Sequence, residues 1–209
     1  MRTLLGIFVL AMLAVATSTA QTEEKNNEVG LLLGGIVTSE PSVASGDLQV
    51  DTGLSFQATY ARRLGGNASA AWYLEFPFVA TPSTEINSTT LGQVPTNYAS
   101  LFITPAIRVK FAPERTISPW ASLGYGYGRF DESTTREDGT PNVSKRGTNT
   151  GVFQFGGGVD IRTPLKIGAP ISLRGEVRDF YSDTPNYAVT TSSDRQHNVV
   201  FSGGFVIHF

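Results

Sequence analysis

Eight stretches of alternating apolar and polar residues organise almost the whole chain. In the clearest stretch, Leu101 and Ile107 share one face, and Arg108 and Lys110 share the opposite face. Successive residues of a β-strand point to opposite sides of a sheet, so each stretch separates two different environments. The pattern therefore predicts an all-β protein whose sheet has one apolar face and one polar face.

The connections between these stretches alternate strictly between long and short. The predicted strands cover residues 29–38, 51–62, 68–80, 97–111, 118–130, 149–163, 170–181 and the stretch that ends at 209. Outer-membrane barrels sort their connections in this way, with short turns on one side and long loops on the other. We therefore predict an eight-stranded antiparallel up-and-down transmembrane β-barrel. Pro77 and Pro105 fall inside two of these strands, and each removes a ladder donor, so local bulges are expected there.

The N-terminus predicts export. Arg2 precedes an apolar run over residues 4–16, and small residues follow up to Ala20. This is the pattern of a secretory signal peptide cleaved after Ala20. The predicted organisation is a signal peptide over 1–20, a flexible lead over 21–28 and a barrel over 29–209.

Charge and composition exclude several classes of protein. Cleavage removes one cation, Arg2, so the formal net charge moves from −2 to −3, which argues against a nucleic-acid partner. The chain has no cysteine, so neither a disulfide framework nor a lipid-modified cysteine is expected. No cluster of His, Cys or Asp has metal-ligand spacing, and no cofactor is expected.

The polar faces of four predicted strands carry charges of both signs, and glycines lie on the polar faces of several strands. A paired and crowded interior requires this composition, whereas a soluble ligand carrier would place its apolar residues inside. We therefore expect the apolar face to meet lipid and the polar face to line a narrow lumen filled by side chains. The predicted interior network consists of Glu75, Arg108, Lys110, Asp160, Arg162, Arg174, Glu176 and Arg178. Within it, ion pairs are expected between Asp160 and Arg174 and around Glu176.

The chain resembles the small outer-membrane barrel proteins of the OmpA/OmpX-like type, without a peptidoglycan-binding domain. The most specific element is the ending, in which Phe205, Ile207 and Phe209 alternate with other residues. In that family a terminal phenylalanine after alternating apolar residues resembles the signal read by the barrel-assembly machinery. The resemblance implies the outer membrane of a Gram-negative type bacterium, with membrane lipids and this machinery as partners.

Three functions follow from this interpretation. The first is a structural or surface-interaction role, in which a rigid barrel displays four mobile loops that could bind surface ligands. The alternative is a narrow, porin-like channel for ions or small solutes. The third, a lipid-modifying enzyme, rests only on His197 near Ser192, Ser193 and Asp194, a spacing that matches no known pattern. We therefore expect no enzymatic activity and no catalytic residues.

Overall fold

The structure is a computed structural model that describes residues 26–39, 47–190 and 194–209. The strands are β1 (Asn27–Thr38), β2 (Gln49–Val50), β3 (Gly53–Gly66), β4 (Ala70–Asn87), β5 (Asn97–Ile103), β6 (Ala106–Phe111), β7 (Ile117–Glu132), β8 (Thr148–Ile167), β9 (Ala169–Asp183) and β10 (Arg195–His208). The described residues contain no helix long and apolar enough to cross a membrane. The predicted signal peptide and its cleavage after Ala20 lie outside the described residues.

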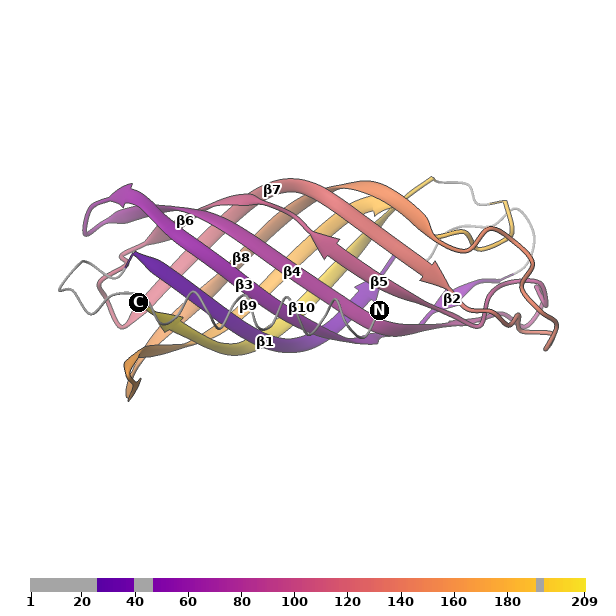
Figure 1. Cartoon of the computed structure of the whole chain (residues 1–209), viewed down its shortest axis with the longest axis horizontal. Coiled ribbons are helices and arrows are strands. Elements are labelled where there is room, and N and C mark those ends of the chain that lie inside the picture. The colour runs from indigo at the N-terminus through magenta and orange to yellow at the C-terminus, as the bar shows by residue number, and fades with distance from the viewer. Residues whose placement is uncertain (1–25, 40–46, 191–193) are drawn as a thin grey trace.

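The strands form one closed antiparallel ring (Figure 1). β1 pairs with β3, β3 with β4, and β7 to β10 pair in chain order, while the short β2 adds to the edge of β4 outside the ring. β1 pairs with β10 over eleven residue pairs, from Glu28–His208 to Thr38–Asn198, and so closes the ring. β5 and β6 are two halves of one ring strand, because both lie between β4 and β7. The eight-stranded up-and-down barrel is therefore confirmed.

The break between β5 and β6 falls at Thr104 and Pro105, in the strand where a proline irregularity was expected. The register is unchanged across the break, since Ile103 pairs with Tyr127 and Ala106 with Gly124. Pro105 thus interrupts the hydrogen-bonded ladder without inserting a residue. β4 continues through Pro77, and the irregularities of pairing lie elsewhere, between Arg63 and Gly65, between Thr81 and Thr84 and between Arg162 and Lys166.

The two faces of the sheet separate as the alternation predicts. Leu31, Leu33 and Leu54 are each about 60% exposed on the outside, while Arg108 and Arg178 are fully buried inside the barrel. A large contiguous apolar surface is not tolerated in water and marks a face that meets lipid or a partner. The outer surface also carries exposed aromatic residues, such as Trp72 and Tyr125, that suit a membrane interface.

The two ends of the barrel differ. The three short turns, the start of β1 and the C-terminus lie at one end, which we call the turn end (left in Figure 1). The long connections lie at the opposite end, which we call the loop end. β4 continues to Asn87, seven residues beyond its predicted end at Ala80, because its last residues pair with β2 and with Asn97 and Tyr98 of β5. The sheet therefore extends well into the first two predicted loops.

Candidate functional site

The half of the lumen near the turn end holds a network of four carboxylates and four cations. Its members are Glu28 (β1), Glu75 (β4), Arg108 and Lys110 (β6), Asp160 (β8), and Arg174, Glu176 and Arg178 (β9). Every member is at most 5% exposed. With equal numbers of the two signs, the network is formally neutral, as burial of so many charges requires.

The tier nearest the turn end is built on Glu28 and Asp160. Lys110 Nζ lies 2.7 Å from Glu28 Oε1 and 2.6 Å from Asp160 Oδ2. Arg174 Nε lies 2.6 Å from Asp160 Oδ1, and its Nη2 lies 3.2 Å from Glu28 Oε2. Arg108 also donates to Glu28. Each carboxylate therefore holds cations from at least two strands, which ties the ring together across its interior.

The deeper tier is built on Glu75, which is completely buried. Its Oε1 lies 3.0 Å from Arg178 Nη2, 3.3 Å from Arg108 Nη1 and 3.6 Å from Arg174 Nη1. Glu176 accepts a 2.5 Å hydrogen bond from Arg178 Nε. The Trp120 ring lies 5.0–5.6 Å from the guanidinium carbons of the same three arginines, so cation–π contacts supplement the ion pairs.

The structure places seven of the eight predicted network residues in this cluster, including the expected pair of Asp160 with Arg174. Arg162 differs from the expectation, because its side chain is exposed at the turn end. There it donates to the carbonyl oxygens of Pro113 and Glu114 at 3.1 Å. It shares the inward face with Asp160 but lies beyond the depth at which the barrel buries side chains.

Sequence reasoning missed Glu28, which it assigned to the flexible lead. β1 begins two residues earlier than predicted, and Glu28 pairs across β10 with His208. The signal was present, since counting back in twos from Leu32 and Gly30 places Glu28 on the inward face. The lead's other described residues, Asn26 and Asn27, are also tied to the barrel, because Asn27 exchanges backbone hydrogen bonds with Phe209.

The other half of the lumen is closed by an apolar plug. Its buried members are Ile36, Leu48, Val79, Ile86, Val94, Tyr98, Phe102, Phe130, Val152, Phe180, Tyr187 and Val200. The Phe102 and Phe180 rings stack with centroids 4.8 Å apart, and Phe130 packs edge-on against Phe102. A conducted ion would have to break the ion pairs of one half and dehydrate in the other. This packing argues against the channel alternative.

At the loop end, two carboxylates hold the loops together by accepting several hydrogen bonds each. Glu132, at the end of β7, accepts hydrogen bonds from the backbone N–H of Gly147 at 2.6 Å and of Asn186 at 2.8 Å, which links two long loops. Asp47 accepts hydrogen bonds from Thr90 and Thr89, and these bonds hold the pKa of its carboxyl below the usual range. The described loop segments thus form an ordered surface.

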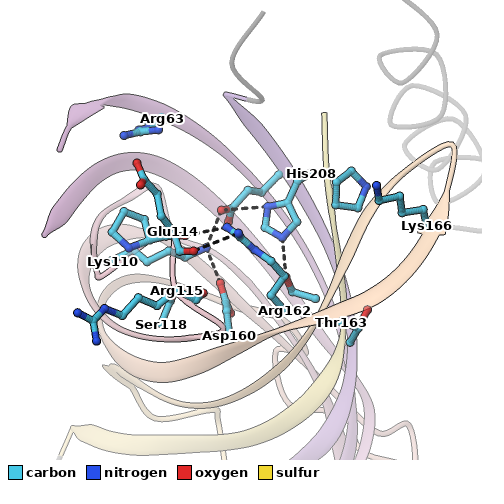
Figure 2. Close-up of a pocket in the computed structure, with 14 residues that line it drawn as sticks. Arg63, Lys110, Glu114, Arg115, Ser118, Asp160, Arg162, Thr163, Lys166 and His208 are labelled. Atoms are coloured by element: carbon cyan, nitrogen blue, oxygen red, sulfur yellow. Dashed lines mark hydrogen bonds and ion pairs between the residues drawn. The ribbon is translucent and has the colours of Figure 1, made fainter. Parts of the chain in front are cut away.

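A pocket of about 430 Å³ opens at the turn end (Figure 2). At its inner wall Ser172 Oγ lies 2.9 Å from His208 Nε2, and His208 Nδ1 lies 3.5 Å from Glu28 Oε1. The order of side chains is that of a nucleophilic triad, yet Glu28 is already bound by Arg108 and Lys110. Arg174 holds it as well, so its charge is shared with three cations and is poorly placed to stabilise an imidazolium.

The other candidate histidine lies on the outside of the barrel near the loop end. His197 Nδ1 lies 2.6 Å from Asp179 Oδ2, but no serine or threonine side chain among the described residues bonds its ring. Ser192 and Ser193 lie outside the described residues. The described residues also contain no group of three or more His, Cys, Asp or Glu side chains that could hold a metal ion.

The C-terminal residues singled out in the sequence end β10 at the turn end. Phe205 and Ile207 are exposed on the outer face, at 57% and 37%, and Phe209 follows the last strand residue. Their alternation places these apolar side chains on one lipid-facing stripe, which is the arrangement the resemblance implies.

A closed antiparallel barrel with an apolar exterior and a charged, filled lumen defines the class of small transmembrane β-barrels. Neither a family model nor a curated protein matches the sequence. Solved structures do match. Neisserial surface protein A has a TM-score of 0.53 at 10% identity, with 89% of this chain and 98% of that chain covered. The outer membrane protein OprG from Pseudomonas aeruginosa has a TM-score of 0.52 at 12% identity, with coverages of 88% and 96%. The attachment invasion locus protein Ail of Yersinia pestis has a TM-score of 0.50 at 11% identity, with coverages of 88% and 99%. The chain has the fold of the small eight-stranded outer-membrane barrels.

Proposed function

We propose that this chain is an outer-membrane protein whose rigid barrel displays an ordered loop-end surface outside the cell. The observation that carries the proposal is the combination of an apolar outer face with a lumen closed by the network and the plug. A barrel that is filled over both halves offers no conduit, so its working surfaces are its two ends. The long loops are the larger of these, and loops carry recognition where a scaffold positions them.

The proposed orientation is supported by the sorting of the connections into short turns and long loops. Outer-membrane barrels place short turns on the periplasmic side and long loops outside. The turn end, with Phe209, then faces the periplasm, from which the barrel-assembly machinery would read the Phe205, Ile207 and Phe209 stripe. Outer-membrane lipids would cover the exterior. The proposal assigns no catalytic role, since the carboxylate beside His208 is engaged by cations of the network, and the His197 ring has no serine or threonine partner among the described residues.

Protease treatment of intact and lysed cells tests this proposal. When trypsin is added to intact cells, it should cut the protein at the exposed Lys145 or Arg146, in the loop between β7 and β8. Exposed Arg115 and Lys166, in the turns of the opposite end, should be cut only after lysis. In parallel, the membrane-extracted protein should shift on a gel after boiling, as compact barrels do. Cleavage at Lys166 in intact cells would invert the orientation, and a monomer freely soluble without detergent would refute the membrane location.

A further inference from the structure

The pocket at the turn end is lined by more cations than carboxylates. Its charged lining residues are Arg63, Lys110, Arg115, Arg162 and Lys166 against Glu28, Glu114 and Asp160, with His208 on the inner wall. Figure 2 shows side chains from several strands and turns arranged around this space. This surplus of positive charge matters for ligand binding only if the buried network does not compensate it.

The network leaves this surplus uncompensated. Glu28 and Asp160 belong to the formally neutral set of four carboxylates and four cations, together with Lys110. The remaining lining cations are four, and the remaining lining carboxylate, Glu114, is one. A formal surplus of three positive charges therefore remains at the pocket mouth.

The cations of the mouth are available to a ligand. The side chains of Arg63, Arg115 and Lys166 make no hydrogen bond or ion pair with the described residues, and they come from three different turns or strand ends. Arg162 is held by two carbonyl oxygens, which fix the guanidinium without neutralising its charge. The partly exposed His208 ring adds a further polar group.

We propose that this pocket binds a small di- or trivalent oxyanion, a phosphate or carboxylate compound free in the compartment that the turn end faces. Oxyanions match guanidinium and ammonium donors in geometry and charge. The volume of about 430 Å³ admits a solute larger than inorganic phosphate. That this compartment is the periplasm rests on the proposed function, whereas the binding itself does not.

Calorimetric titration of the full mature protein in non-ionic detergent tests the proposal, with pyrophosphate and citrate as separate probes. The pocket variant is R115Q/K166Q, whose two residues are exposed and lie outside the network. The matched control is K145Q/R146Q, which removes the same charge from exposed positions at the loop end. The pocket variant should bind the probe about tenfold more weakly than wild type, since each exposed ion pair is a modest contribution. The control should bind like wild type.

The two probes separate the sources of the oxyanion, because preference for pyrophosphate indicates a phosphorylated solute and preference for citrate a polycarboxylate. Equal binding by all three proteins, or no saturable binding of either probe to wild type, would overturn the proposal. The heat-induced gel shift of each variant shows that the barrel is intact. Failure here with correct protease orientation would reject the oxyanion site and leave the proposed function standing.

Discussion

Glu75→Gln is the sharpest test of the interior network. Glu75 Oε1 lies within 3.6 Å of three arginines, and its side chain is completely buried. At the 3.0 Å that separates it from Arg178 Nη2, the Coulomb energy of one ion pair is about 5.5 kcal/mol at an effective dielectric constant of about 20. Removing one partner of a buried pair costs about 3–5 kcal/mol, because the remaining charge keeps its desolvation penalty. We expect E75Q to lower the free energy of unfolding by that amount.

The assay is urea unfolding of the barrel in lipid vesicles, followed by the fluorescence of Trp120 in a Trp72→Phe background. Trp120 lies against the network, and Trp72 is exposed on the outside, so the remaining signal reports on the lumen. Glu114→Gln, an exposed carboxylate with no ion pair among the described residues, is the matched control. A loss in E75Q within about 1 kcal/mol of the control would show a hydrated lumen of high dielectric constant and refute the reasoning.

Three further changes probe other parts of the molecule. Replacing Phe102 and Phe180 together by Ala should loosen the plug but leave the ion-pair network in place, so planar-bilayer recordings should show no steady conductance in the double variant or in wild type; a conducting wild type would restore the channel interpretation. Glu132→Gln should weaken its hydrogen bonds to two loops and speed limited tryptic cleavage at Lys145 several-fold, and unchanged cleavage would show that Glu132 does not order them. The folded-state pKa of Asp47 is lowered, so the loop attachment it provides is complete above its unfolded pKa and is lost as pH falls below about 4. Proteolysis of the first loop by pepsin should therefore rise with acidification in wild type and be high at every tested pH in Asp47→Ala.

The sequence predicted which side of the sheet each residue faces, because odd and even positions along a strand point to opposite sides. Arg108, Lys110, Arg174 and Arg178 were assigned inward from alternation, and the structure buries all four. This alternation does not tell how far along the barrel axis a residue lies. Arg162 therefore entered the predicted network although it lies at the rim, where the barrel no longer covers it.

The apolar plug was beyond sequence reasoning for a related reason. Phe102, Phe130 and Phe180 lie on inward-facing positions among polar neighbours, so each looks like an exception in its own strand. Only the tilt and stagger of the closed barrel bring them to one depth, where Phe180 stacks on Phe102 and Phe130 packs edge-on against it. Glu132 is similar, since its partners in two other loops depend on how those loops fold back.

The division of the lumen into a charged half and an apolar half bears on where the molecule can act. The network near the turn end carries equal numbers of positive and negative charges. It therefore contributes little to the electrostatic potential at the mouth of the pocket. The charged residues outside it, Arg63, Arg115, Arg162 and Lys166 against Glu114, then set the potential of the pocket. If the network were incomplete, these same residues would be drawn inward as its missing partners and would offer nothing to a ligand. The availability of the mouth cations therefore depends on the four cations of the network, because the loss of any one of them would leave a surplus buried carboxylate.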